Sequence, residues 1–318
     1  MKPIKLIKNR SDIGAGTRGS DLGVDAIEIA AINQGSDYFN QFPFEDIKTH
    51  NESIYDKDRS TVAKRIEHVV EQCIRLNNSI QKNLKDYFPI VLSGDHSSAL
   101  GTISGIKSAF PEQNVGVIWI DAHADLHSPY TSPSGNIHGM PLAAALANDN
   151  LDAKTNAVDS DTQKYWEEMK QIGYKGPKIQ PENLVYFGVR DTEEAEDQQM
   201  ERLSIRNYKV DEVRYRGLET CVAEALVKLS HCEVLYISFD VDSMDCDLIS
   251  YGTGTPVAKG FDQYEVIAII DQIIKTKKVV CIEVVEVNPL LDTKGNKMAE
   301  TAFQVLEAVT STLVLPIE

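Results

Sequence analysis

The sequence predicts an α/β fold in which helices pack on a central, mainly parallel β-sheet. Two observations carry this prediction. Short apolar runs that read as strands alternate with longer segments that read as helices, and the apolar runs are continuous rather than alternating. Strands that alternate with helices indicate repeated βαβ units. A continuous apolar run is typical of a parallel strand covered on both faces.

The elements follow one another along the chain. The first predicted strand ends at the turn signal Ser93-Gly94, and the other apolar runs have similar lengths. The five predicted strands span residues 89–92, 115–120, 184–188, 234–239 and 279–285. The helix-length segments span about 58–84, 99–110, 219–229, 264–276 and 299–313.

No stretch of linker composition divides the chain, so we expect a single domain over residues 1–318. One segment, at about 148–181, departs from the pattern because it is polar and rich in Asp, Lys and Gln. It also holds Tyr165 and Trp166. A loop of this length inside a compact domain is usually functional or mobile. We expect a polar insertion that carries a short helix.

Composition and charge narrow the classes of function. The net charge of -16 argues against non-specific nucleic-acid binding, which needs clustered Lys and Arg. No run approaches the roughly 18 apolar residues of a membrane span, and residues 1–10 are too briefly apolar for a signal peptide. The five cysteines are scattered and form no CxxC pair, which predicts neither a disulfide framework nor a cysteine zinc site. We therefore expect a cytoplasmic protein that binds a small molecule.

Polar clusters follow four of the five predicted strands. Ligands of open α/β sheets bind at the carboxyl ends of the strands, so these clusters should converge. Alternate side chains of an extended segment share a face, which directs the acidic and histidine residues of each cluster to one side. The clusters are Gly94-Asp95-His96-Ser97, Asp121-Ala-His-Ala-Asp125, Asp240-Val-Asp242 and Glu286-Val-Asn-Pro289.

The clusters bring four carboxylates and two imidazoles to one point. Without a cation these carboxylates would repel each other, whereas two divalent ions would balance them. Ligands rich in oxygen and poor in imidazole favour manganese over zinc, and a pair of such ions activates water near neutral pH. Any one cluster has a structural explanation, as a helix cap or a solvated turn. Four clusters at strand ends together favour a metal site.

These motifs, with Gly14-Ala-Gly-Thr-Arg-Gly-Ser-Asp-Leu-Gly23 near the start, resemble the ureohydrolase family of arginase, agmatinase and formimidoylglutamase. The resemblance covers nearly the whole chain. It implies a three-layer α/β/α fold, two Mn²⁺ ions per subunit and a homo-oligomer, either a trimer or a hexamer. It also implies that hydroxide held by the two ions attacks the guanidino carbon, and that Asp125 takes the remaining proton. By motif position, His96 and Asp125 would bind one ion, His123 and Asp242 the other, with Asp121 and Asp240 bridging.

Within the family, the segment Thr131–Pro141 is most similar to arginase. The resemblance implies that Ser134 and Asn136 hold the α-carboxylate of the substrate. It also implies that His138 moves a proton to the leaving amine, a role that suits an imidazole pKa near about 6.5.

Glu286 matches the residue that pairs with the guanidinium, and Thr255 matches a threonine close to it. Three features depart from the arginase pattern. Asp245-Cys246-Asp247 replaces the Asp-Pro turn of the family, with one residue added before Thr255, and two further positions differ where the ends of the substrate would bind. His127 stands where arginases usually have Asn, and Glu193, in the segment with Asp191, stands where they have an Asp that reads the α-amino group. Both positions would contact substrate.

Hydrolysis of L-arginine to L-ornithine and urea is the favoured interpretation. The second is another hydrolase of the family, which acts on formimidoylglutamate, agmatine or a different guanidino acid. Ser134 and Asn136 favour a substrate with an α-carboxylate, which agmatine lacks, whereas a protonated His127 could meet an additional carboxylate. The third is a non-catalytic metal-binding homologue.

Overall fold

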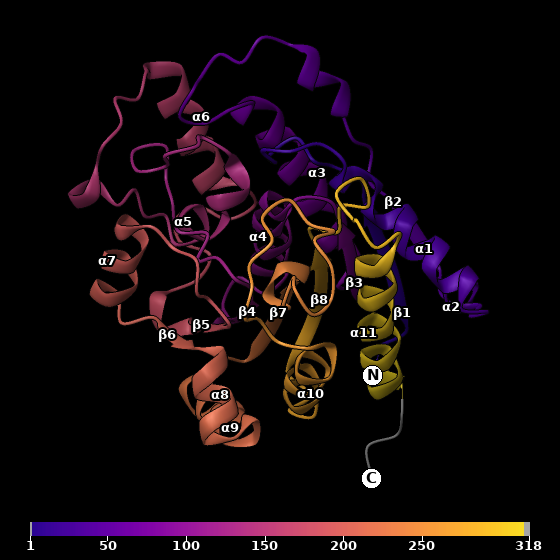
Figure 1. The fold of residues 1–318 in the computed structure, drawn as a ribbon. Coiled ribbons are helices and arrows are strands. Elements are labelled where there is room, and N and C mark those ends of the chain that lie inside the picture. Colours follow the sequence, from indigo (N-terminus) through magenta and orange to yellow (C-terminus); the bar gives the residue numbers. More distant parts are fainter. Residues whose placement is uncertain (1, 315–318) are drawn as a thin grey trace.

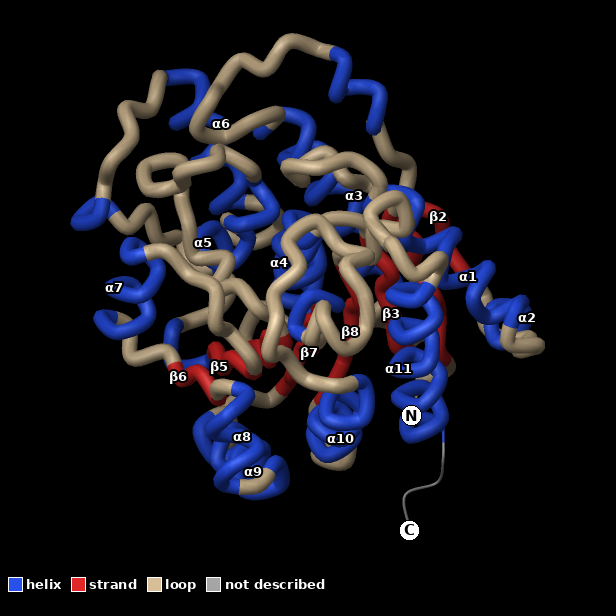
Figure 2. Tube along the Cα trace, in the orientation of Figure 1, coloured by secondary structure: helices blue, strands red, loops and turns tan. Residues whose placement is uncertain are grey.

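One eight-stranded sheet forms the centre of the computed structural model, which describes residues 2–314 (Figures 1 and 2). Every neighbouring pair of strands is parallel. The strands are β1 (Ile4–Asn9), β2 (Phe44–Asp46), β3 (Phe88–Ser93), β4 (Val115–Ile120), β5 (Leu184–Phe187), β6 (Arg206–Tyr208), β7 (Val234–Asp240) and β8 (Val279–Val285).

The strand order decides where a site can form. It runs β2-β1-β3-β8-β7-β4-β5-β6, so β3 and β4 follow each other in the sequence but are separated in the sheet by β8 and β7. The connections from these strands diverge at this point and leave a crevice at their carboxyl ends. The four central strands are the ones that precede the four polar clusters.

Helices cover both faces of the sheet, which confirms the three-layer architecture (Figure 1). Among the described residues, no helix combines the length and apolarity needed to cross a membrane. The layer of α3 to α6 comprises α3 (Ile66–Asn83), α4 (Ala99–Ala109), α5 (Pro141–Ala145) and α6 (Ser160–Gln171). The opposite side holds α1 (Gly23–Asn33), α2 (Tyr38–Gln41), α8 (Val210–Arg216), α9 (Leu218–Lys228), α10 (Gln263–Ile274) and α11 (Lys297–Val314), while α7 (Glu194–Arg202) follows β5.

Alternate residues of β4 show how the sheet separates two apolar cores. Ile118 and Ile120 pack with α1 and α9 to α11, whereas Val117 and Trp119 pack with α3 to α6. All four side chains are buried. This burial on both faces explains why the predicted strands read as continuous apolar runs.

All five predicted strands and all five predicted helices are present, with one boundary error. The helix expected from about residue 58 begins at Ile66, because Arg65 adopts a left-handed conformation with φ 56° and directs its guanidinium to the carbonyls of Ile13 and Ala15. The sequence analysis missed the outer strands β1, β2 and β6 and the helices α1, α2, α5, α7 and α8. Apart from the mostly apolar helix α1, these elements are short or carry many polar residues, so they give weak apolar patterns.

The polar segment at about 148–181 contains the short helix α6, as predicted. Its interior is fixed by buried contacts. Trp166 is fully buried and its ring nitrogen donates to Asp149 Oδ1 at 2.7 Å, an oxygen that also accepts from Lys170 Nζ at 2.7 Å. The segment is thus packed against α3 and α5. Strands from residues 4 to 285 share one sheet. The single domain over residues 1–318 stays a prediction.

A buried carboxylate lies beneath the strand ends and yields a test of the fold. Glu283 of β8 is fully buried and accepts hydrogen bonds from Ser93 Oγ and Tyr236 Oη, each at 2.6 Å. We expect Tyr236→Phe to destabilise the protein by about 1–3 kcal/mol, because a buried carboxylate loses a donor that no water can replace. Urea unfolding measures this, with Tyr215→Phe as control since Tyr215 is 91% exposed. Equal stability of the two variants would contradict the proposed weight of this hydrogen bond.

Candidate metal centre and active-site cavity

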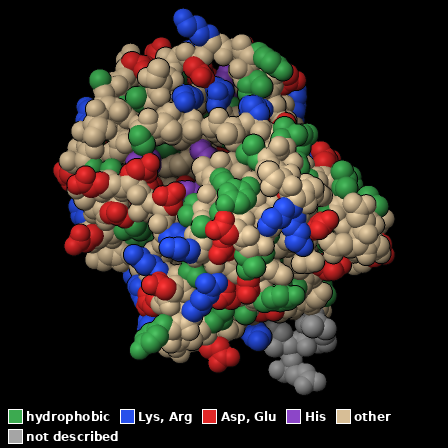
Figure 3. All heavy atoms as spheres, in the orientation of Figure 1, with side chains coloured by type: hydrophobic (Ala, Val, Ile, Leu, Met, Phe, Trp, Pro, Cys, Tyr) green, Lys and Arg blue, Asp and Glu red, His purple; other side chains and the backbone are tan. Residues whose placement is uncertain are grey.

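The loops that follow β3, β4, β7 and β8 surround a cavity of about 270 Å³. Figure 3 shows a hollow on this face with histidine side chains inside it and acidic side chains along its edge. Every site residue expected from the sequence lines the cavity except Asp121, which is buried just behind the wall. The prediction that the four clusters converge is therefore confirmed.

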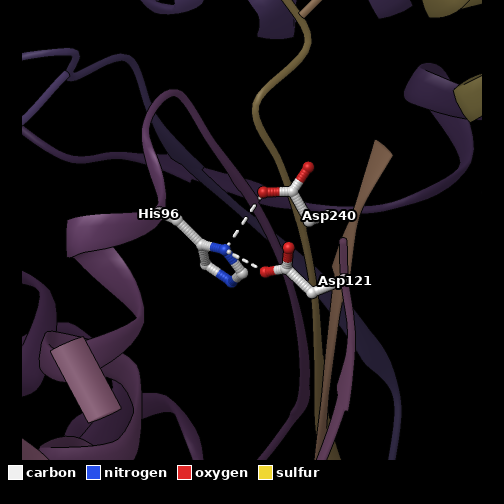
Figure 4. Close-up of side chains that lie close together, drawn as sticks. All are labelled: His96, Asp121 and Asp240. Atoms are coloured by element: carbon white, nitrogen blue, oxygen red, sulfur yellow. Dashed lines mark ion pairs between the residues drawn. The ribbon is translucent and has the colours of Figure 1, made fainter. Parts of the chain in front are cut away.

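The first group of ligand atoms surrounds His96 (Figure 4). Three carboxylate oxygens approach His96 Nδ1: Asp121 Oδ2 at 3.0 Å, Asp240 Oδ2 at 3.1 Å and Asp125 Oδ2 at 3.2 Å. Among the described residues, neither His96 Nδ1 nor Asp121 Oδ2 has a hydrogen bond, although both atoms are buried. Buried polar atoms normally have partners. Several carboxylate oxygens around one buried nitrogen that lacks a hydrogen bond are an arrangement that fits a bound cation.

The second group surrounds His123. His123 Nδ1 lies 3.1 Å from Asp242 Oδ2 and 3.5 Å from Asp121 Oδ1. Asp121 thus directs one oxygen to each group, as a bridging ligand would. Asp240 directs Oδ2 to His96 and accepts the backbone N–H of Asp242 with Oδ1 at 2.8 Å. Its role as a second bridge stays a prediction.

Neighbouring groups hold His96 in the orientation that a ligand needs. Its Nε2 lies 2.7 Å from Ser238 Oγ, and its ring stacks on Trp119 with ring centroids 4.0 Å apart. A hydrogen bond at one ring nitrogen leaves the other free for a metal. The backbone N–H of His96 donates to Glu286 Oε1 at 2.9 Å, which joins the loop after β3 to the loop after β8.

Burial and mutual repulsion perturb the carboxyl groups. Burial, with the charges of Asp242 and Asp121, raises the pKa of Asp240 well above its ordinary value. Burial and the charge of Asp121 raise the pKa of Asp125 to about 6. Such shifts mean that ionised carboxylates in this space lack countercharge. Divalent cations supply it, so the donor set fits two hard ions.

Glu286 and His138 lie next to the two groups. His138 Nδ1 is 3.1 Å from Glu286 Oε1. Burial alone would lower the pKa of His138, but the hydrogen bond and charge of Glu286 outweigh it and raise the pKa to about 9. Thr255 Oγ1 donates to Asp242 Oδ2 at 3.0 Å. Its hydroxyl therefore bonds to the second group rather than to Glu286. Asp191 Oδ2 lies 3.6 Å from His123 Nε2 and orients that ring.

The two departures from the arginase pattern contact each other. His127 Nε2 lies 2.8 Å from Glu193 Oε2 and 3.5 Å from Glu196 Oε2, and its Nδ1 lies 3.1 Å from Thr131 Oγ1. Both ring nitrogens of His127 are therefore engaged within the protein. The sequence analysis missed the buried Glu196. Its spacing from Glu193, which forms a capping box at the start of α7, is the signal that could have identified it.

The other end of the cavity holds Ser134 and Asn136. Asn136 Oδ1 accepts from Lys64 Nζ at 3.4 Å, a lysine that the sequence analysis also missed. The glycine-rich segment near the start of the chain approaches the same amide. A Cβ at Gly16 would lie 2.3 Å from Asn136 Nδ2, so a larger residue there would displace Asn136. These contacts fix the amide at the cavity wall.

Comparison with known proteins agrees with this geometry. The sequence model of the Arginase family matches residues 3–311. This chain belongs to the arginase family. The arginase of Bacillus subtilis is 33% identical to it over 311 residues, with 97% of each chain covered. The arginase of Bacillus caldovelox is 32% identical, with 96% of this chain and 97% of the relative covered.

Solved structures of arginase-family proteins share the fold. The crystal structure of arginase from Bacillus subtilis matches with a TM-score of 0.79 at 31% identity, and the native arginase structure from Bacillus caldovelox with 0.82 at 30% identity. Both matches cover 100% of each chain. The membership establishes a metal-dependent hydrolase that acts on linear amidines, with a small guanidino compound as the kind of substrate.

The metal centre gives the next test. Purified protein should bind two manganese ions per chain, and chelation should remove activity. Asp240→Ala should abolish turnover and lower stability in the presence of manganese, because it removes a ligand from a site whose metal binding contributes to folding. Metal analysis and thermal unfolding measure both effects, with the exposed Asp86→Ala as control. Full activity with one ion or none would contradict two-ion chemistry.

Proposed function

We propose that this chain is a manganese-dependent arginase that hydrolyses L-arginine to L-ornithine and urea. The observation that carries the proposal is one cavity with two different ends. Its inner end holds the metal-binding groups beside Glu286 and His138, and its outer wall holds Ser134 and Asn136. A substrate with a guanidinium at one end and an α-carboxylate at the other has the matching chemistry.

The inner end would bind and activate the guanidinium. When bound by His96, His123 and the four aspartates, two manganese ions supply the Lewis acidity that activates water near neutral pH. The ligand roles are those expected from the sequence, and the two groups of oxygens and nitrogens support them. Glu286, fixed by the backbone N–H of His96, would face the planar cation and accept paired hydrogen bonds from it.

Proton movement would follow from the side chains near the inner end. Asp125, whose pKa burial and Asp121 raise to about 6, is suited to accept a proton. His138, whose pKa Glu286 raises to about 9, is suited to donate one to the leaving amine. Bound cations would oppose the rise at His138 and bring its pKa nearer to neutrality. Both groups would then work close to their own pKa values.

The outer wall would recognise the amino-acid end. Because Lys64 occupies the oxygen of the Asn136 amide, the Nδ2 donor is left for a carboxylate. Glu193 and Glu196 would attract the α-amino group, and His127 between them would moderate that attraction. Asp191 and Thr255 would act through the ligands His123 and Asp242 that they contact.

The alternatives place different demands on this wall. Agmatine would leave Ser134 and Asn136 without a carboxylate. A second carboxylate, as in formimidoylglutamate, would require His127 to turn away from Glu193 and Thr131. A non-catalytic homologue would have no use for His138 and Glu286 beside the metal groups. Arginine agrees best with the contacts present.

Two further proposals concern the setting of the enzyme. All five cysteines are free and buried, which supports a reducing, cytoplasmic environment. The homo-oligomer of three or six chains stays a prediction, and analytical ultracentrifugation tests it.

A substrate panel tests the proposed function. Arginine, agmatine, formimidoylglutamate and guanidinobutyrate are each incubated with the manganese-loaded protein, and the products are identified. We expect urea and ornithine from arginine at the highest kcat/KM. The side chain of Glu193 is one methylene longer than Asp, and a misplacement of about 1 Å can cost on the order of 10²-fold in rate, so arginine turnover is expected to be modest. Hydrolysis of formimidoylglutamate without that of arginine would overturn the proposal.

The same panel applied to His127→Asn examines the outer wall. The substitution should preserve or improve kcat/KM for arginine, because it frees Glu193 from its ion pair while the metal content stays unchanged. If kcat/KM instead fell most with formimidoylglutamate, His127 would be identified as a residue that binds a substrate carboxylate.

Proton transfer is tested by His138→Asn. We expect kcat to fall by about 10- to 10⁴-fold, the usual contribution of a general acid, with two ions still bound. The exposed His50→Asn is the matched control. A fully active His138→Asn enzyme over the whole pH range would leave His138 a structural role only.

A further inference from the structure

Arg190, in the loop after β5, makes an unusual set of contacts. Its guanidinium donates only to backbone carbonyls, and no carboxylate within the described part of the chain forms an ion pair with it. The distances run from 2.8 to 3.4 Å. The acceptors are the carbonyl oxygens of Gly188, Asp242, Ser243, Met244, Val257 and Ala258.

These carbonyls belong to segments that form the second metal-binding group. Asp242 is itself one of the expected ligands, and its carbonyl accepts from Arg190 Nη2 at 3.0 Å. Val257 and Ala258 follow Thr255, whose hydroxyl donates to the Asp242 carboxylate. The guanidinium therefore joins the loop after β7 to the loop that supports its ligand.

The backbone of Arg190 joins the third segment. Its N–H donates to the carbonyl of Ala122 at 2.8 Å, and the N–H of Asp191 donates to the same oxygen at 3.0 Å. Ala122 lies between the expected ligands Asp121 and His123. One residue thus contacts all the segments that supply Asp121, His123 and Asp242, whereas the loop that carries His96 is not among its contacts.

Arg190 does not act on substrate. It is absent from the lining of the active-site cavity and instead faces a groove on the outer side of the loop. The guanidinium of Arg190 is instead suited to connecting several loops through hydrogen bonds. The guanidinium is planar and has five N–H donors in fixed directions, whereas lysine has three donors on a flexible stem. The carbonyls of Ser243 and Val257 also accept the backbone N–H groups of Phe261 and Cys246, at 3.0 and 3.4 Å, and Arg190 gives them a further donor.

We propose that Arg190 is a positioning residue that sets the affinity of the second metal-binding group, Asp121, His123 and Asp242. This inference rests on the two-ion centre of the proposed function. Its positive charge by itself would disfavour a cation nearby, and the six carbonyl dipoles offset that charge. Geometry, rather than charge, is therefore the contribution of Arg190.

Arg190→Lys keeps the charge and removes the planar fork, whereas Arg190→Met removes both. The two stepwise dissociation constants for Mn²⁺ are measured by calorimetry on metal-free protein, and electron paramagnetic resonance distinguishes a coupled pair of ions from a single ion. In both variants one of the two dissociation constants, that of the ion held by Asp121, His123 and Asp242, should be about 10- to 100-fold higher, as when partners behind metal ligands are removed. The other constant should stay close to that of the unaltered protein.

The control is Arg214→Lys. Arg214 also donates to a carbonyl of this region, that of Gly260, but it pairs with Glu265 and contacts neither ligand loop. It should change neither constant. Thermal unfolding of the metal-free variants separates a local effect from a general loss of folding.

Three outcomes would overturn the inference. They are unchanged second-ion binding in Arg190→Lys, tighter second-ion binding in Arg190→Met, and equal weakening of both ions with a lower metal-free unfolding temperature. The proposed function fails separately. An unaltered protein that binds two ions but ignores arginine would refute the arginase proposal while the metal measurements still decide the role of Arg190.

Discussion

Repulsion among buried carboxylates is the constraint on which the rest of this structure depends. Asp121, Asp125, Asp240 and Asp242 lie within one small space at the carboxyl ends of the central strands. Burial of unpaired charge is costly, and the two histidines alone do not offer enough countercharge for four carboxylates and Glu286. The sheet can hold this arrangement because the loops that follow β3, β8, β7 and β4 leave a crevice at the carboxyl ends of these neighbouring strands.

A second set of contacts, hydrogen bonds from the backbone, orients the carboxylates. Backbone N–H groups of His123 and Asp242 donate to Asp121 and Asp240, at 2.7 and 2.8 Å. Because these donors come from the loops themselves, the fold contributes to the orientation of the ligands. Pre-oriented ligands lose less conformational freedom on binding, which favours tight binding by a set of oxygen-rich donors.

The two ends of the cavity differ in the chemical groups that line them. The inner end holds carboxylates beside His96 and His123, which suits a guanidinium, whereas the outer wall combines the carboxylates of Glu193 and Glu196 with the polar groups of Ser134 and Asn136. His127 is the main departure on that wall, and its engagement with Glu193 reduces the local negative charge. We expect substrate preference to depend on this pair of residues, which differ together from the arginase pattern, because a change in one alters the contacts of the other.

The sequence by itself determined the parallel α/β fold, the central strands and the polar clusters that meet at one cavity. It could do so because continuous apolar runs report burial on both faces, and because ligand clusters directly follow those runs. The outer strand β1 escaped detection because its lysines interrupt the apolar pattern, and it is recognisable only from its pairing with β2 and β3. Only the tertiary structure decided that Asp121 directs one oxygen to each histidine, that His127 bonds to Glu193, and that Arg190 joins the loops behind Asp242. These contacts connect residues far apart in the chain, so local patterns carry no record of them.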